Sequence, residues 1–152
     1  MKKLSLAIFA ILLSCSALAK DFEAWTVKCP VAKPCVITQM IMKQQNDSAN
    51  VIAGVSYFNY QEQAVLKIRI SAQADPTKGI GLKFDEQKPL HLPITNCDKK
   101  LCEVNVIADQ QLINDLQNGK VMSVAYLLKS NQQQTAFPVI LTGFKQAYSS
   151  IH

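Results

Sequence analysis

Side chains that could carry acid–base catalysis are few in this sequence. Its 152 residues include two histidines, and one of them, His152, is the last residue. A serine-hydrolase triad would therefore depend on His91, which lies among residues 89–93 on an expected edge strand, and no Gly-x-Ser-x-Gly motif accompanies it. The adjacent carboxylates Asp85 and Glu86 are typical of a turn at a strand end, and less so of a glycosidase acid pair. We therefore assign no catalytic residue and expect a protein that is not an enzyme.

Two other patterns match ligand sites only in part. Gly79 and Gly81 resemble the start of a phosphate-binding loop, but the third glycine, the following helix and a Lys-Ser/Thr pair are missing. Glycines inside a strand more often permit a bulge or a close backbone approach. Trp25 and the aromatic residues at positions 57, 58 and 60 would suit a binding surface, although core packing is the favoured interpretation for Trp25. We expect no bound cofactor.

Cysteine spacing is more informative, because the first residues indicate an export signal and exported proteins form disulfide bonds. Four cysteines follow that signal, and an even number in an exported chain indicates disulfide bonds. Proximity favours two local bridges, Cys29–Cys35 and Cys97–Cys102, since two prolines lie inside the first loop and an Asn-Cys-Asp turn opens the second. Each would contribute about 2 kcal/mol and a long-range bridge about 4 kcal/mol, so loop entropy alone leaves the pairing open. Neither pair has the two-residue gap of a zinc knuckle, and we expect no metal.

The polar residues around the second cysteine pair form a candidate interaction surface. A short closed loop would hold them in a fixed arrangement, and they are Asn96, Asp98, Lys99 and Lys100. Elsewhere in the mature chain the basic residues are spread singly, and the formal net charge falls from +5 to +3 once Lys2 and Lys3 are removed. There is no basic helix and no stripe of alternating basic and aromatic residues, so we expect no nucleic-acid partner.

The first residues have the pattern of a signal peptide. Two lysines give a positive start, residues 4–13 are almost continuously apolar, and residues 17–19 (Ala-Leu-Ala) suit a cleavage site. The apolar run is shorter than the about 20 residues that span a bilayer. We therefore predict a signal peptide at 1–19 and a mature β domain at 20–152 without a transmembrane segment, located in the periplasm or at the outer membrane or cell surface.

A second interpretation of the same segment makes the protein a lipoprotein. Leu12-Leu13-Ser14-Cys15 is a loose version of a lipoprotein processing site, in which Cys15 would carry the lipid. Two acyl chains hold a protein stably on a membrane where a single chain does not. Because the middle leucine fits poorly and the Ala-x-Ala site follows closely, cleavage after Ala19 is the favoured interpretation.

Alternating apolar and polar residues dominate the mature chain and predict half-buried β-strands. In residues 65–70, Leu66, Ile68 and Ile70 share one side and two basic residues take the other. Pro138, which cannot donate to a ladder, is expected at an edge or a bulge. Residues 120–129 are apolar on both sides, which suits a central strand. The other expected strands span residues 22–29, 35–43, 51–60, 79–85, 101–108 and 134–142.

Helices are expected in two places. Asp109 is a good N-cap, Leu112 and Leu116 share a face, and Gly119 follows as a stop, while a weaker helix covers residues 144–151. Many short strands with few helices predict a mostly β, single-domain antiparallel β-sandwich or partly closed barrel with one or two short helices and two local disulfides.

One ordered set of residues covers nearly all of the mature chain, namely Trp25 with Cys29, then Cys35, residues 79–85 (Gly-Ile-Gly-Leu-Lys-Phe-Asp), the pair Cys97 and Cys102, the helix ending at Gly119, and Gly143-Phe144. In these residues the chain resembles the invasion associated locus B family of exported bacterial proteins. Leu101 stands where the family usually has glycine, and the helical and C-terminal segments follow the family pattern loosely, as in a distant member.

The resemblance implies a periplasmic or outer-membrane-associated β domain linked to host-cell invasion, and it brings no catalytic residues. We therefore expect a non-enzymatic envelope or cell-surface protein that binds a protein or surface partner. One alternative is a periplasmic accessory or inhibitor module that acts on an envelope partner. A small hydrolase is less favoured, because the acid–base groups are missing.

The export signal leads to a direct prediction. Mass spectrometry of the protein purified from bacterial envelopes should show an N-terminus at Lys20, because the small residues of the cleavage site end at Ala19. A diacylated Cys15 would contradict the soluble form and make the protein a lipoprotein. An unprocessed Met1 in the cytoplasm would contradict export itself.

Overall fold

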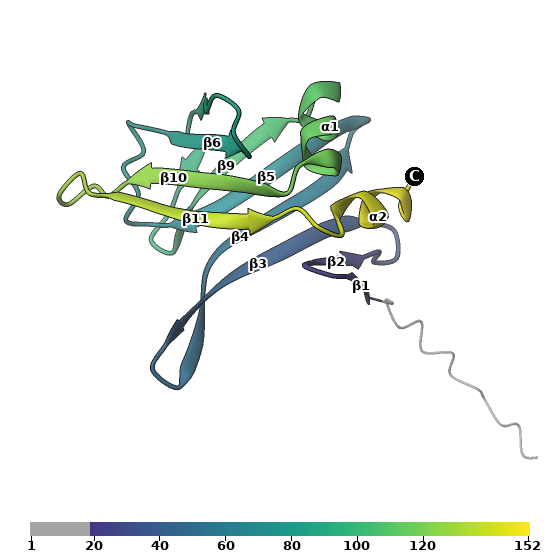
Figure 1. Cartoon of the computed structure of the whole chain (residues 1–152), viewed down its shortest axis with the longest axis horizontal. Helices are drawn as coiled ribbons and strands as arrows, with labels where there is room; N and C mark the ends of the chain where they lie inside the picture. Colours follow the sequence, from purple (N-terminus) through teal and green to yellow (C-terminus); the bar gives the residue numbers. More distant parts are fainter. Residues whose placement is uncertain (1–18) are drawn as a thin grey trace, which may run out of the picture.

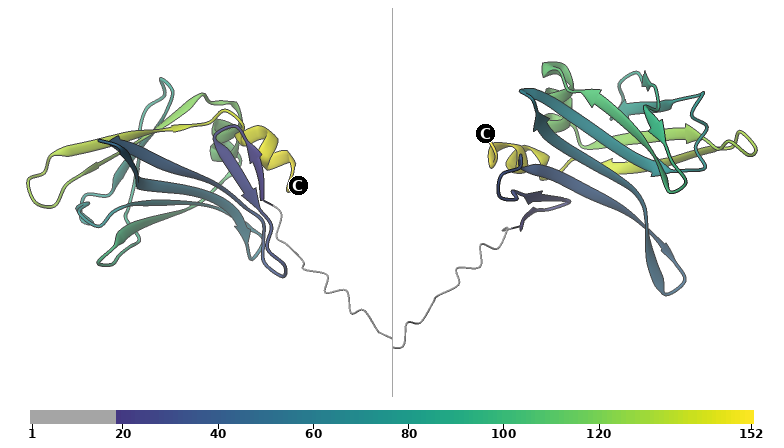
Figure 2. Two further views of the ribbon diagram at one scale, coloured as in Figure 1. Left: turned by 90° about the horizontal axis from the view of Figure 1, so that it is seen from below. Right: turned by 180° about the vertical axis from the view of Figure 1, so that it is seen from behind.

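Residues 19–152 are described by the computed structural model, and they form two antiparallel β-sheets with two short helices (Figures 1 and 2). All of the predicted signal peptide except Ala19 lies outside these residues, and so does Cys15. The arrangement is a two-layer β-sandwich and not a closed barrel, which decides between the two architectures expected from the sequence. Within residues 19–152, no helix has both the length and the apolar character needed to cross a membrane.

The larger sheet has seven strands, which follow the order β1-β2-β3-β4-β5-β9-β8. All neighbouring strands in this sheet pair antiparallel, and short turns join those that are consecutive in the chain. The bounds of these strands are β1 Ala19–Phe22, β2 Trp25–Lys28, β3 Val36–Gln45, β4 Ser48–Tyr60, β5 Gln63–Ser71, β8 Asn96–Cys97 and β9 Leu101–Ile107.

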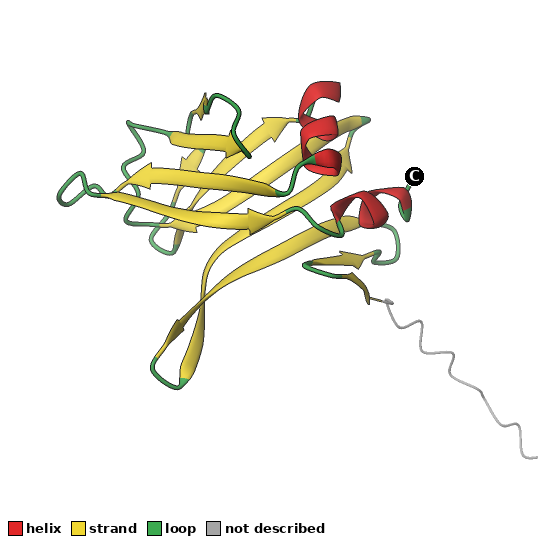
Figure 3. Ribbon diagram, in the orientation of Figure 1, coloured by secondary structure: helices red, strands yellow, loops and turns green. Residues whose placement is uncertain are grey.

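The smaller sheet has four strands in the order β11-β10-β6-β7, and the two helices lie at one end of the sandwich (Figure 3). As expected, residues 121–127 form a central strand and Pro138 lies on an edge strand. The helix beginning after Asp109 is also confirmed, because the Asp109 carboxylate accepts the Leu112 N–H at 2.8 Å. The bounds are β6 Ile80–Phe84, β7 Leu90–Leu92, β10 Val121–Leu127, β11 Gln134–Ile140, α1 Gln110–Asn118 and α2 Phe144–Ser149.

Most expected strands differ by one or two residues at their ends, β8 was not expected, and two regions differ more. Residues 22–29 are split into β1 and β2, because the chain reverses at Glu23, whose φ of 52° is in the left-handed region. The loop expected at residues 44–50 is only a tight turn at Asn46 and Asp47, since β3 and β4 continue to pair as far as Gln45 and Ser48. The β3–β4 hairpin is consequently longer than its apolar residues alone indicate.

Both local disulfides expected from spacing are present in the sandwich. Cys29–Cys35 closes the turn between β2 and β3, and Cys97–Cys102 links paired positions of β8 and β9. Because each bridge closes a short loop, each restricts the unfolded chain only modestly. Burial of alternate strand residues supplies the core, at about 1.5–3 kcal/mol for each large apolar side chain removed from water.

The two sheets are joined at Ile140, the last residue of β11. The Trp25 indole Nε1 donates to the Ile140 carbonyl at 2.9 Å, and the Gln39 amide both donates to that carbonyl at 2.7 Å and accepts the Ile140 N–H at 3.1 Å. Gln39 is one of the few buried polar residues, and a buried amide needs hydrogen-bond partners. Both of its hydrogen bonds described here are made to Ile140. We call this set of contacts the Ile140 joint.

Aromatic packing against Trp25 supports the Ile140 joint. The Phe144 ring at the start of α2 meets the Trp25 ring edge-on at 5.0 Å between centroids and the Tyr57 ring at 5.6 Å. Gly143 precedes it with a φ of 92°, and a Cβ there would lie 2.1 Å from the Phe22 carbonyl oxygen. A glycine is therefore required for α2 to reach the aromatic residues.

The Ile140 joint leads to a stability prediction. The substitution Gln39→Ala should lower the free energy of unfolding by about 1–3 kcal/mol, because it leaves the partly buried Ile140 N–H without its side-chain partner. Chemical denaturation monitored by tryptophan fluorescence measures this change. The control is Met40→Ala, one residue along β3 on the exposed side, which should change stability by no more than about 0.5 kcal/mol. Equal losses for both variants would contradict the proposed role of Gln39.

Candidate binding site

The seven-stranded sheet divides between β4 and β5. These strands pair from Tyr60–Gln63 only as far as Gly54–Arg69. Beyond that point residues 48–51 and Ala53 of β4 pair with β3 alone, while Ile70 and Ser71 of β5 pair with β9 alone. We call this division of the sheet the fork.

A β-bulge accounts for the direction of one branch. The β3–β4 register shifts between Ile41 and Met42, and Ile52 of β4 is left without a partner. A bulge bends its strand and increases the local twist. The end of the hairpin, residues 40–53, therefore leaves the body of the sandwich as a projecting arm, which Figure 1 and the right-hand view of Figure 2 show.

The arm exposes apolar side chains on a two-stranded ribbon. Met40 is 58% exposed and Met42 is 52% exposed, and Val51, the partner of Met42 across the hairpin, is 53% exposed. A two-stranded hairpin is at best marginally stable in water. Its exposed apolar side chains bury little surface against the rest of the domain, and exposed apolar patches often mark interaction sites. The arm is therefore suited to contact another molecule.

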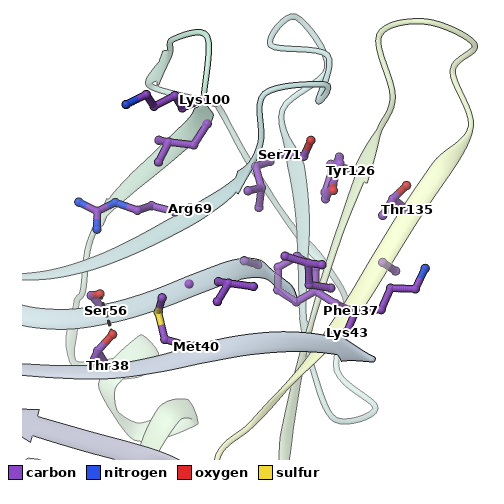
Figure 4. A pocket seen from close by; sticks show the side chains of 17 residues that line it. Thr38, Met40, Lys43, Ser56, Arg69, Ser71, Lys100, Tyr126, Thr135 and Phe137 are labelled. Carbon is purple, nitrogen blue, oxygen red and sulfur yellow. Dashed lines mark hydrogen bonds between the residues drawn. The ribbon is translucent and has the colours of Figure 1, made fainter. Parts of the chain in front are cut away.

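A cleft of about 770 Å³ lies in the fork, and Figure 4 shows the side chains around it. Its apolar floor consists of buried residues from both sheets, because the gap between β4 and β5 opens onto the inner face of β10 and β11. The floor is made by Ala53, Ile70, Tyr126 and Phe137, and the rest of the lining by Thr38, Met40, Lys43, Val51, Ile52, Gly54, Ser56, Arg69, Ser71, Lys100, Leu101, Thr135 and Ala136.

Charge around the cleft is one-sided. Its described lining includes Lys43, Arg69 and Lys100 but no aspartate or glutamate. The Arg69 Nε donates to the carboxylate of Glu103, which lies outside the lining, at 2.8 Å, and the Lys67 ammonium lies 3.6 Å from the same carboxylate. The hydrogen bond from Arg69 and the charge of Lys67 hold the pKa of Glu103 below its ordinary value. Among residues 19–152 neither Lys43 nor Lys100 forms an ion pair. The cleft therefore carries uncompensated positive charge.

Hydroxyl groups give the cleft further polar contacts. Thr38 and Ser56 lie within hydrogen-bond distance of each other at 3.2 Å on adjacent strands. The Tyr126 hydroxyl can donate a hydrogen bond, and burial raises the pKa of Tyr126 further above its ordinary value. The cleft thus combines an apolar floor with positively charged and hydroxyl groups, which suits binding of a partly apolar anion.

The interaction surface predicted from the sequence is divided by the structure. All four of its residues are exposed at the β8–β9 turn, where the Asp98 carboxylate turns inward and accepts the N–H groups of Lys100 at 2.6 Å and Leu101 at 2.9 Å. These two bonds lower the pKa of Asp98, whose role is to hold the turn. Lys100 lines the cleft, whereas Asn96 and Lys99 do not.

The other residues considered for chemistry have structural roles. His91 is on edge strand β7, where its Nε2 lies 2.9 Å from the Lys78 carbonyl oxygen, which can only accept a hydrogen bond. Gly79 has a φ of 68°, and a Cβ there would lie 2.4 Å from the Leu92 carbonyl oxygen. The Asp85 carboxylate accepts the backbone N–H groups of Lys120 and Val121. In the part of the chain that the structure describes, no three His, Cys, Asp or Glu residues gather as metal ligands.

Sequence reasoning missed most of the cleft. Lys100 is the one residue common to the predicted surface and the lining. Tyr126 and Phe137 were expected only as strand residues, and Arg69 only as the polar side of β5. The available signal was the run of apolar residues on both sides of the arm, Met40 to Met42 and Val51 to Ala53, which a half-buried strand does not need.

Comparisons with known proteins agree with this fold. The chain is similar over 88% of its length to 95% of a crystallised chain, the invasion associated protein B of Bartonella henselae, with a TM-score of 0.78 and 21% identity. At that identity the likeness establishes the fold alone. A comparison with curated proteins gives no match.

The structure brings together the residues that carry the resemblance to the family. Trp25, Gly143 and Phe144, which carry the resemblance to the family, all meet at or beside the Ile140 joint, and the four cysteines form the two local bridges. The model of the family described as "Invasion associated locus B (IalB) protein" matches residues 23–152. Since this match covers most of the sequence, the chain belongs to the invasion associated locus B family.

Proposed function

We propose that this protein is exported to the bacterial envelope or cell surface, where it binds a partner protein or a host surface and catalyses no reaction. The cleft in the fork is the observation that supports this proposal most directly. It has an apolar floor, positive charge and an adjacent arm with exposed methionines, which adapt to the shape of a partner.

Its chemistry supports binding more than catalysis. A hydrolytic or transfer site needs a nucleophile or metal, a base near the proton it removes, and donors for the developing charge. The cleft lining offers Tyr126 and Lys43 as donors, but none of its described residues is a histidine or carboxylate that would act as a base at neutral pH. His91, on β7, is absent from that lining.

Family membership supports a role in the envelope and in virulence. The structurally similar Bartonella henselae protein is described as invasion associated. We extend that association to this chain and place it in the periplasm or at the outer surface, without a nucleic-acid partner. The two disulfides are consistent with an oxidising compartment.

A second candidate function is a periplasmic accessory or inhibitor module that acts on an envelope partner. The same cleft and arm would serve it, so the two candidates differ in location. Protease treatment of intact cells separates them. Digestion of the protein supports surface exposure, and protection until the outer membrane is opened supports the periplasmic function.

Complementation of a deletion strain tests binding against catalysis. The variant His91→Ala should retain the cellular function, because His91 contributes only an exposed contact at a sheet edge. The double variant Met42→Asp and Val51→Asp should lose at least about tenfold, since it places charge on the apolar side of the arm, where each buried contact is worth about 1.4 kcal/mol or more.

Thermal melting of each purified variant is the control, because both arm residues are exposed and should leave folding unchanged. A folded His91→Ala protein without function would contradict the non-catalytic proposal. A folded arm variant with full function would show that the arm does not contact the partner.

A further inference from the structure

We propose that the fork binds an extended, acidic segment of the partner protein as an added β-strand. This inference rests on the proposed function and specifies which part of the domain contacts the partner and what the partner supplies. It follows from three independent properties of the fork, namely its unpaired strand edges, its charge and its apolar floor.

The first property is backbone pairing. A strand presents alternate N–H and C=O groups to each side, and a strand edge without a neighbour is a template for another chain. Residues 48–53 of β4 have no strand on the side facing β5, and Ile70 and Ser71 have none on the side facing β4. Among the described residues, the backbone contacts outside the ladders supply no partner for these β4 groups, whereas the Ser71 carbonyl already accepts the Ala74 N–H at 3.1 Å, so β4 provides the main open edge. An extended peptide would satisfy them by strand addition.

The second property is charge complementarity. Lys43 from the arm and Lys100 from the β8–β9 turn both line the cleft, and both are without an ion pair among the described residues. Two carboxylates lie near these lysines and both are already engaged, since Glu103 is shared by Arg69 and Lys67 and Asp98 accepts the N–H groups of Lys100 and Leu101. Acidic side chains on the added strand would meet these lysines, whereas basic side chains would be repelled.

The third property is the space above the apolar floor. Side chains on one face of an added strand would point through the fork toward Phe137 and Tyr126, as alternate residues of a strand do. Gly54 borders the cleft on the outer side of the sheet, opposite the floor residue Ala53, and a Cβ there would come no closer than 3.5 Å to the Met40 sulfur. A larger residue at 54 would therefore fill the outer side of the cleft without a backbone clash.

Nuclear magnetic resonance of the isotopically labelled, disulfide-bonded protein tests the proposal. The probe is a nine-residue peptide that alternates valine with glutamate. We expect it to shift the amide signals of residues 48–53, 70, 71 and 135–137. The same peptide with lysine in place of glutamate, and the glutamate peptide with a central proline, should each bind at least about tenfold more weakly, because they lose charge attraction or strand pairing.

Three variants sharpen the test. Lys100→Glu and Gly54→Val should each weaken binding of the glutamate peptide at least about fivefold, by reversing a charge and by filling the cleft. Lys99→Glu is the matched control, because Lys99 is the adjacent lysine of the same turn and lies outside the lining. It makes the same change in net charge and should leave the affinity within about twofold.

Equal effects of Lys99→Glu and Lys100→Glu, or shifts confined to residues outside the fork, would overturn the proposal. So would binding of lysophosphatidylglycerol at the fork without binding of either peptide, which would assign the cleft to a lipid. Concentration-dependent shifts at the fork without peptide would assign it to a second copy of the chain. If the fork fails these tests while the arm variant still loses function in cells, the proposed function stands and the contact lies elsewhere on the arm.

Discussion

The contact between the two sheets at Ile140 is the constraint on which the rest of this structure depends. β11 is an edge strand, and an edge strand leaves half of its backbone groups without ladder partners. At Ile140 those groups are taken by the side chains of Trp25 and Gln39, which come from the other sheet. The joint thus satisfies an exposed edge and fixes how the sheets face each other.

The residues that mark the family are explained by this constraint. Trp25 supplies both a hydrogen bond and a ring face for Phe144, and Gly143 permits the turn that brings Phe144 beneath it. Strand β2, near the start of the described residues, is thereby tied to the helix α2. These residues maintain the fold, and the region that we propose for binding begins beside the joint at Met40 and extends along the arm.

The Ile140 joint and the fork are related features of the sandwich. β3 takes part in both, since Gln39 lies in the Ile140 joint while the next residue, Met40, lines the cleft. The joint holds the base of the arm in place while residues beyond the bulge project away from the core. The body of the domain therefore presents the arm and the cleft in a fixed relative orientation, which lowers the entropy lost on binding.

Most of the strands were predictable because their pattern has a local cause. Alternation in residues 65–70 follows from one buried side, and the cap at Asp109 follows from the needs of a helix end. The turn at Glu23 was not predictable, because its left-handed backbone belongs to a residue that seldom adopts it.

The candidate site was less predictable than the fold. The apolar run around Ile52 marks the arm in the sequence, but the residue at which β4 and β5 stop pairing is seen only in the folded sheet. The turn at residues 96–100 was identified from its cysteines and polar residues. Its division into a structural aspartate and a lysine that lines the cleft depends on the folded turn.

Amide hydrogen exchange measures the central claim most directly, and β11 contains its own control. Because Leu141 donates to Lys120 across the ladder, the alternate residues Ile140 and Ala136 direct their N–H groups to the open edge. The Ile140 N–H is bonded to Gln39, and Ala136 has no such bond among the described residues. We predict that Ile140 exchanges at least about a hundredfold more slowly than Ala136, since local opening must break the joint. Equal exchange rates at the two amides would contradict the account.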